Sequence, residues 1–294
     1  MGKLLECVPN FSEGTDTAII EEVVASAKPA KVLDLHSDPD HNRSVVTLVG
    51  DPQQISEAAF NLTRTAVELM DIKEHAGVHP YIGVVDVIPF IPLRDMSLEE
   101  TCRLAHDLGA RLWNELNLPV YFYGEAAKIA ERKELPYVRK GSYSLLKMEI
   151  DKPDRRPDIG HGLHHSAGAT AVGVRDFLIA FNVELDTVDI DIARSIARNI
   201  REKMGGLPGV RAMGVTLASK GITQVTINIT RHKDAPLKDV FDEVKKWAYE
   251  YQVEILCSEL VGLVPREAVF PEMKEYLKLP AFSENQILEN HLPS

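Results

Sequence analysis

Apolar and polar residues follow two distinct periods along the first ninety residues of this 294-residue chain. Short runs rich in β-branched residues, bounded by Pro, Gly, Asn and Asp, indicate strands, whereas apolar residues spaced three and four apart indicate amphipathic helices. The pattern predicts strands over 4–8, 32–35, 43–49 and 84–91, a first helix over 19–27 and a second helix over 55–69. Their order, β-α-β-β-α-β, is that of the ferredoxin-like fold.

The middle of the chain adds a further α-β unit, a helix over 98–116 followed by a short strand over 119–123. Between residues 140 and 168 the periodicity disappears, and Pro, Gly, Asp and His become frequent. A loop of this length inside a compact protein is usually a lid or binding loop, or else a linker. We therefore expect residues 140–168 to form an irregular loop.

The second half repeats the element order of the first. Its pattern predicts strands over 177–185, 211–217, 222–230 and 254–264, with helices over 193–200 and 240–251. No repeat is visible in the letters themselves, so the duplication rests on element order. The sequence thus predicts an α+β fold of two ferredoxin-like (βαββαβ) subdomains, over 1–175 and 176–294. Each antiparallel sheet then has both helices on one face, and two such sheets can leave a ligand cleft between them.

The strand over 223–230 bears on this cleft. Apolar residues point to one of its faces, while Gln224, Thr226 and Asn228 point to the other. Gln and Asn are poor strand formers, which favours a functional reason for their presence in a groove. A strand whose polar side simply faces solvent is the alternative interpretation.

Composition excludes several classes of partner. The formal net charge is -11 and the sequence pI is near 5.4, which argues against duplex nucleic acid or an anionic membrane as a partner. The cysteines Cys7, Cys102 and Cys257 are odd in number and far apart, so a disulfide framework is not expected and a reducing cytoplasm fits. No apolar run reaches the length that crosses a membrane.

The joint between the second helix and the strand that follows it carries the strongest chemical signal. His75, Gly77, His79, Pro80 and Gly83 all fall within it. The residue before a proline is held extended, so His79 sits on a stiff backbone. An imidazole presented at the mouth of a sheet suits proton transfer near neutral pH. A hydrogen-bonded turn histidine is the alternative, and this stretch alone leaves both open.

Other chemistries have weaker support. Seven histidines fall in predicted loops or joints, but none shows the helical spacing of a metal site, and no GxSxG, GxGxxG or Walker pattern is present. Metal catalysis is therefore disfavoured and no metal ligand is assigned. Arg43 and Arg175 could each hold a carboxylate with two hydrogen bonds or simply be solvated. The histidines are His36, His41, His75, His79, His161, His164 and His165.

Several blocks in order resemble the glutamate formimidoyltransferase (formiminotransferase) family over nearly the whole chain. They are LECVPNFSEG (5–14), DHNRSVVT (40–47), HP (79–80) with Gly83 and DVIPFIP (86–92), VYFYGEAA (120–127), PDIG (157–160), GATAVG (168–173), FLIAFN (177–182), QVTIN (224–228) and ELVGLVP (259–265). The resemblance implies two ferredoxin-like subdomains, a homodimer and tetrahydrofolate bound as co-substrate in the cleft. The implied reaction exchanges a formimidoyl group between glutamate and tetrahydrofolate, as in histidine degradation. The chain ends too soon for the cyclodeaminase that often follows in animals.

The resemblance also implies site residues. It places the catalytic general acid and base at His79 and the folate-binding loop at Gly160, His161, Gly162, Leu163, His164, His165, Ser166, Ala167 and Gly168. Polar residues expected to face the cleft and bind folate or substrate are Asn10, His36, Asn42, Arg43, Arg175, Asn182, Gln224 and Asn228.

The chain departs from the family beside the histidine. Many members have an acid and a cation where this chain has Val78 and Tyr81, and some have Asp where it has His36. His36 could replace a lost charge partner. Three alternatives stay open: a formyltransferase that uses 5-formyltetrahydrofolate, a folate-binding protein without turnover, and a metal-dependent hydrolase.

Overall fold

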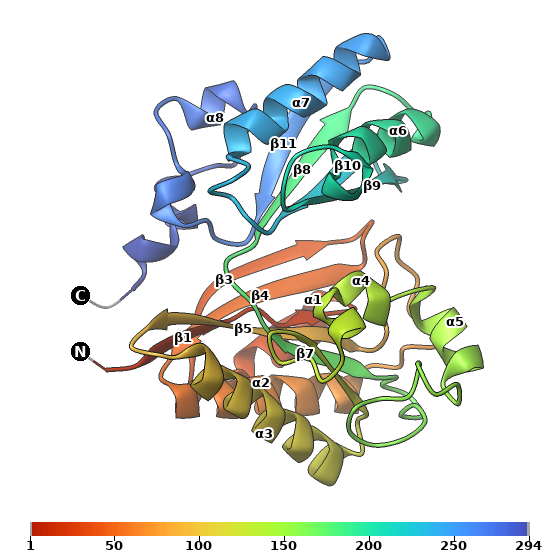
Figure 1. Cartoon of the computed structure of the whole chain (residues 1–294), viewed down its shortest axis with the longest axis vertical. Helices are drawn as coiled ribbons and strands as arrows, with labels where there is room; N and C mark the ends of the chain where they lie inside the picture. The colour runs from red at the N-terminus through yellow and green to blue at the C-terminus, as the bar shows by residue number, and fades with distance from the viewer. Residues whose placement is uncertain (1, 293–294) are drawn as a thin grey trace. The chain divides into compact units, whose positions relative to one another are not determined.

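The computed structural model describes residues 2–292, and the chain forms two compact units, Met1–Asp176 and Phe177–Ser294. Each unit has its own sheet and its own apolar core (Figure 1). Within the described residues, no helix is both long enough and apolar enough to cross a membrane.

The first unit is built on a seven-stranded sheet. From one edge to the other its strands are β3, β4, a position shared by β1 and β2, and then β5, β7 and β6. Strands β1 and β2 both pair with β4 and β5, so they act as one interrupted central strand. The pairs from β3 to β5 are antiparallel, whereas β5, β7 and β6 run parallel. The elements are β1 (Leu4–Cys7), β2 (Asn10–Phe11), α1 (Thr17–Ala25), β3 (Lys31–Asp38), β4 (Arg43–Gly50), α2 (Pro52–Leu69), β5 (Val85–Arg94), α3 (Leu98–Leu116), β6 (Val120–Gly124), α4 (Leu135–Val138), α5 (Ser142–Glu149) and β7 (Thr170–Val174).

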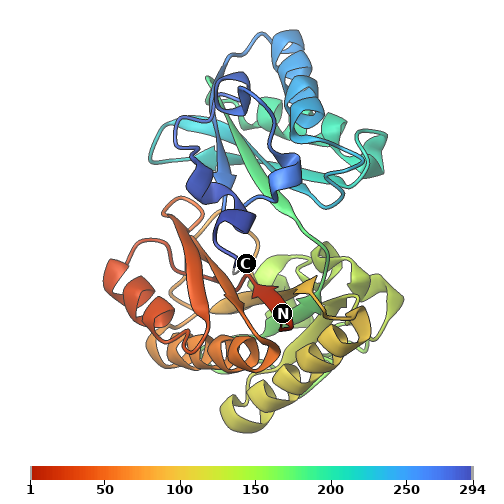
Figure 2. The same cartoon turned by 90° about the vertical axis from the view of Figure 1, so that its left-hand side faces the viewer.

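Helices α1, α2 and α3 cover one face of this sheet (Figures 1 and 2). Each begins at a residue whose side chain accepts backbone N–H bonds in the first turn, a preference of Asp and Ser at helix starts. Asp16 caps α1, while Asp51 with Gln54 and Ser97 with Glu100 form capping boxes on α2 and α3. The core beneath the helices contains the fully buried rings of Phe11, Phe60, Phe90 and Phe122.

Part of the opposite face is covered by the segment that carries α4 and α5. Val138 and Leu146 from this segment pack with Tyr121 and Tyr123 of β6 in a smaller cluster. The expectation of an irregular loop over 140–168 is therefore wrong for its first part, where α5 forms. Strand β7 was not predicted either, because Thr170–Val174 is short and follows a Gly-rich stretch.

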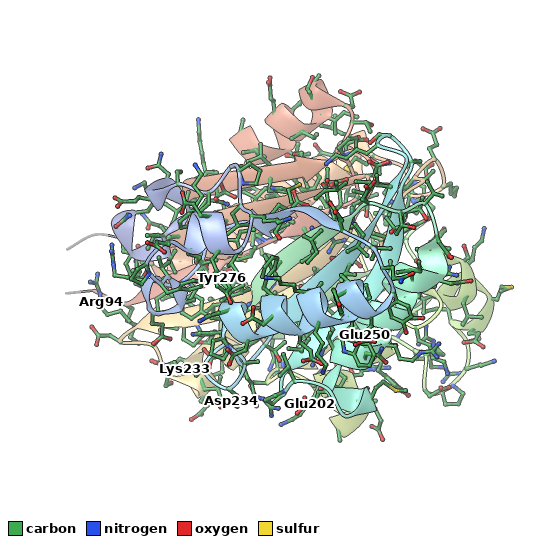
Figure 3. All side chains as sticks on the ribbon, turned by 90° about the horizontal axis from the view of Figure 1, so that it is seen from above. Arg94, Glu202, Lys233, Asp234, Glu250 and Tyr276 are labelled. Carbon is green, nitrogen blue, oxygen red and sulfur yellow. The ribbon has the colours of Figure 1, made fainter. Side chains whose placement is uncertain are left out.

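The second unit has the ferredoxin-like topology that the sequence predicts. Its four strands lie in the order β11, β8, β10, β9, all neighbours are antiparallel, and α6 and α7 share one face (Figure 1). The elements are β8 (Ile179–Leu185), α6 (Ile190–Ile200), β9 (Val210–Leu217), β10 (Ile222–Ile229), α7 (Leu237–Glu250), β11 (Ile255–Val261) and α8 (Met273–Tyr276). Charged side chains such as Glu202, Lys233 and Glu250 are exposed on this unit (Figure 3). The predicted fold class, α+β with two ferredoxin-like subdomains, is confirmed.

Strand β3 is longer than its sequence pattern indicated. The pattern predicted a strand over 32–35, but His36, Ser37 and Asp38 continue it and pair with Val45, Ser44 and Arg43 of β4. Polar residues are common on an edge strand, since they discourage pairing with other chains. Because Ser, Asp and Pro are also typical of turns, the sequence pattern ends this strand too early.

Candidate active site

His79 lies in the joint between α2 and β5, where its ring is partly buried. Its Nδ1 is 2.7 Å from the carbonyl oxygen of Pro80. A carbonyl oxygen can only accept a hydrogen bond, so the neutral ring carries its proton on Nδ1. The other ring nitrogen, Nε2, then holds a free lone pair and can take a proton from a substrate.

The surroundings of His79 favour its neutral form. Burial lowers its pKa well below the ordinary value of 6.5, and the positive charges of Arg43 and Arg139 lower it further. The ring of His41 also contributes, with its centroid 6.0 Å from that of His79. The imidazole therefore remains available as a base below pH 6.5.

A buried carboxylate organises the cations near His79. Asp86 on β5 is fully buried and bonds Arg43 Nη1 at 2.8 Å and Arg139 Nη2. Asn10 Oδ1 accepts two further bonds from the Arg43 guanidinium, at 2.8 and 3.1 Å. Burial lowers the pKa of Arg43 to about 10, aided by Arg139 and opposed by Asp86. The three ionised groups together leave one positive charge.

Two turns hold the joint in place. Asn42 accepts a bond from the Gly14 N–H at 2.8 Å and donates to the Ala76 carbonyl at 3.0 Å. His75 Nδ1 donates to the Ser12 carbonyl at 2.9 Å, because that oxygen can only accept. These contacts connect the β2 turn, the turn before β4 and the joint. Of the predicted site residues, Asn10, Asn42, Arg43 and His79 are thus brought together.

The predicted folate-binding loop, residues 160–168, is bonded to the two ends of the same joint. The N–H groups of Ile72 and Val84 donate to the carbonyls of Ser166 and Ala167 at 2.7 and 3.0 Å. His164 and Gly168 pair with each other as an antiparallel bridge, and Gly168 has a φ of 74°, which favours glycine. The loop is therefore fixed next to the joint that carries His79.

The first part of this loop packs on the end of α3. The His161 ring meets the Trp113 indole edge to face at 5.0 Å, and Gly160 lies against the same indole. His164 Nδ1 accepts the Ala167 N–H at 3.0 Å. The remaining members differ in exposure. Leu163 packs into the core, Gly162 and Ser166 are partly buried, Ala167 is buried, and His165 is exposed.

Tyr81 links the joint to the segment that carries Arg139. Its N–H donates to Ser142 Oγ at 3.0 Å, and that hydroxyl donates back to the Tyr81 carbonyl at 2.8 Å. The Tyr81 ring meets His75 edge to face at 4.3 Å and stacks on Tyr143 at 6.4 Å. Tyr81 thus has a packing role beside the histidine.

Two predicted residues of the first unit lie further out. His36 and Asn10 flank Val45 in one row of the sheet, on strands β3 and β2. They are therefore separated by two strand spacings, or about 10 Å. Arg175 follows β7, and its Nη1 donates to the Asp176 carbonyl at 2.9 Å. Among the described residues, the ion pairs of this cluster join Asp86 to Arg43 and Arg139 and include neither His36 nor Arg175.

In the second unit, Asn182, Gln224 and Asn228 share the sheet face that the helices leave uncovered. Asn182 and Gln224 are buried, and both side-chain amides donate to Glu259 Oε1, at 2.8 and 3.3 Å. Asn228 lies one row beyond Thr226, which is opposite Asn182. The polar set of β10 thus belongs to a hydrogen-bonded cluster.

Sequence reasoning missed Asp86, Arg139 and Glu259 as site residues. An aspartate inside the otherwise apolar strand 84–91 was a readable signal for Asp86, because a buried carboxylate needs a cationic partner. Arg139 lies next to the stretch expected to be irregular, where no pattern marked it. Glu259 could be recognised only once its strand was placed beside β8.

Comparison with known proteins adds independent information. A model of the formiminotransferase domain, N-terminal subdomain, matches residues 4–175, and a model of the formiminotransferase domain matches residues 180–290. A glutamate formimidoyltransferase of Thermoplasma acidophilum is 42% identical over 98% of this chain and 97% of its own length. A glutamate formimidoyltransferase of Streptococcus pyogenes serotype M1 is 42% identical over 99% of both. The formimidoyltransferase-cyclodeaminase of Mus musculus is 40% identical, and this chain spans 51% of its length.

Proposed function

The chain belongs to the formiminotransferase family, and from this premise we propose that it is a folate-dependent transferase. It exchanges a formimidoyl group between N-formimidoyl-L-glutamate and tetrahydrofolate. The observation that supports this reaction best is the His79 ring, whose Nδ1 is occupied by Pro80 and whose Nε2 is left basic.

The reaction needs one proton to move between two nitrogens. The N5 amine of tetrahydrofolate attacks the formimidoyl carbon and forms a new C–N bond, which gives a tetrahedral adduct. His79 Nε2 takes the proton that N5 loses. The C–N bond to the glutamate nitrogen then breaks, and the same imidazole returns the proton to that nitrogen. General acid and base catalysis of this kind is worth about a hundredfold or more.

We propose that loop 160–168 binds the folate, supported by its backbone bonds to both ends of the joint. We propose that folate or substrate is also bound by Asn10, His36, Asn42, Arg43, Arg175, Asn182, Gln224 and Asn228. We further propose that the protein is a cytoplasmic homodimer, and sedimentation of the purified protein tests the dimer.

The decisive experiment is consumption of N-formimidoyl-L-glutamate that depends on tetrahydrofolate, with wild type compared with His79→Ala. The variant should lose about a hundredfold or more in kcat. His106→Ala is the matched control, because His106 also binds a backbone carbonyl, that of Ala126, but packs on Phe122 beneath the helices. An active His79→Ala enzyme contradicts the assignment.

The pH profile gives a second measurement on the same group. The lowered pKa of His79 means that the ring loses its proton below pH 6.5 in the free enzyme. The acid limb of kcat/KM, which reports the free enzyme, should therefore have its midpoint below 6.5. A midpoint above that value would show that another group, or a charged His79, controls the rate.

Parallel assays with 5-formyltetrahydrofolate and glutamate test formyl transfer.

A further inference from the structure

We propose that Arg139, together with Arg43, binds the α-carboxylate of the amino-acid substrate beside His79. This inference rests on the proposed function and specifies how the donor is held. Asp86 Oδ2 accepts hydrogen bonds from both guanidiniums, from Arg43 Nη1 at 2.8 Å and from Arg139 Nη2. The substrate carboxylate approaches the remaining donors.

The charge balance of this cluster favours an anion. The side chains of Arg43 and Arg139 are only 9% and 13% exposed, and Asp86 is not exposed at all. Two buried cations share one carboxylate, which is costly unless another negative group joins them. Among the described residues, Asp86 is the one carboxylate that forms an ion pair with either guanidinium.

Arg139 also has unused hydrogen-bonding capacity. Its buried Nε has no hydrogen-bond partner among the described residues, whereas Arg43 uses its Nε, Nη1 and Nη2 on Asn10 and Asp86. A guanidinium offers five N–H donors in a planar fork that matches a carboxylate. Arg139 is thus the better candidate for the second carboxylate.

The location identifies which substrate carboxylate is bound. Asp86, which holds both guanidiniums, also accepts the N–H of Ile82 at 3.1 Å, and Ile82 is three residues after His79, so the cluster lies beside the joint that carries the imidazole. In N-formimidoyl-L-glutamate the α-carboxylate and the reacting nitrogen are attached to the same carbon. A carboxylate held by Arg139 therefore keeps the breaking C–N bond close to His79, whereas the γ-carboxylate lies further along the side chain.

Arg139 is held in position by its own segment. It follows α4, and its carbonyl accepts the Ser142 N–H at 2.8 Å. Ser142 is bonded in both directions to Tyr81, two residues after His79. The backbone that presents Arg139 is thus tied to the backbone that presents the imidazole, which fixes the cation relative to the base.

Two amides of the donor test the proposal. N-formimidoyl-L-glutamine keeps the α-carboxylate, and N-formimidoyl-L-isoglutamine replaces it with a neutral amide. Wild type should prefer the first in kcat/KM by about tenfold to a hundredfold, the strength of a charge-assisted carboxylate contact. In Arg139→Gln the ratio of kcat/KM for the two amides should be close to one, whereas Arg139→Lys should keep part of the wild-type preference.

Arg103→Gln is the control, because Arg103 is an exposed arginine on α3 paired with Glu99. It should keep the wild-type preference. A folded Arg139→Gln protein that still prefers the glutamine donor overturns the proposal. If that variant does not fold, wild type alone decides, since equal use of the two amides also overturns it.

Equilibrium binding separates this proposal from the proposed reaction. L-glutamate should bind wild type about tenfold or more tighter than L-isoglutamine, and Arg139→Lys should narrow this difference. A wild-type protein that binds in this way but transfers no formimidoyl group would contradict the reaction and support the carboxylate site. Active transfer with no such difference in binding would support the reaction and contradict the carboxylate site.

Discussion

Asp86 is a buried carboxylate held by three donors, the guanidiniums of Arg43 and Arg139 and the backbone N–H of Ile82. Burial alone would raise its pKa, but Arg139 and Arg43 outweigh burial and lower the pKa. The ionised form is therefore favoured in the folded protein. A single side chain thus fixes two cations that add to the effect of burial and lower the pKa of His79 further.

Asp86→Asn should destabilise the protein by about 3–5 kcal/mol, because it leaves two buried guanidiniums without their carboxylate. Urea unfolding at pH 7 measures the loss. Asp191→Asn, at an exposed residue paired with Arg194, should change stability by less than about 0.5 kcal/mol. Equal stability of Asp86→Asn and wild type would contradict the ion-pair account.

The pH dependence of this difference has a defined sign. The pKa of Asp86 is lowered on folding from its ordinary value of 3.8. Its ionisation therefore stabilises the folded state above pH 3.8, and that stabilisation is lost as the pH falls through the lower folded-state pKa. The difference in free energy of unfolding between wild type and Asp86→Asn should therefore become smaller in that acid range.

At this scale the sequence marked candidate side chains but not their hydrogen-bond and ion-pair partners. The stiff His-Pro step was recognisable from local chemistry. Asp86 lies 43 positions from Arg43 and 53 from Arg139, and periodicity gives no information about ion pairs over such separations. The cluster therefore emerges only from the folded chain.

At the scale of elements, the entry to β5 is where the joint and the loop proposed to bind folate, residues 160–168, meet. Gly83 bridges Gly168 and lies against the carbonyl oxygens of Ala167 and Ala169. A Cβ at this position would collide with backbone atoms, which cannot move aside as a flexible side chain can. The glycine thus permits the close approach of the two segments.

Gly83→Ala should therefore lower the free energy of unfolding by about 2–4 kcal/mol, and the displaced loop should weaken folate binding. Chemical denaturation and tetrahydrofolate binding measure the two effects. Gly2→Ala is the control, because a Cβ there would meet nothing within 4 Å. Unchanged stability and binding in Gly83→Ala would show that the loop tolerates a larger separation.

Elements with strong periodicity were predicted well, and those defined by tertiary contacts were not. Helices α2 and α3 have both an apolar stripe and capping residues, so their sequences suffice. Strand β7 is five residues long and is buried by its parallel neighbours β5 and β6. Helix α5 has only eight residues and depends on packing of Leu146 against the tyrosines of β6. Short elements of this kind carry too little local signal.

At the scale of the whole molecule, element order was the informative feature. The repeated β-α-β-β-α-β order predicted the strand order of the second unit, because the connections of a split βαβ unit allow few alternatives. In the first unit the same order is extended by β7 and β6 on the β5 side. The boundary at residues 175 and 176 and a ligand cleft between the subdomains remain predictions.

The second unit should fold as an isolated fragment of residues 177–294. Its core is its own, with Phe181, Ile196 and Phe241 packed between the sheet and the helices. The opposite face carries Asn182, Glu184 and Gln224, which tolerate water. The fragment should unfold cooperatively in urea by circular dichroism. Phe181→Ala should lower its stability by about 3–5 kcal/mol, and Tyr249→Ala, at a residue 82% exposed, by less than about 0.5 kcal/mol. A fragment without a cooperative transition would show that this core is insufficient alone.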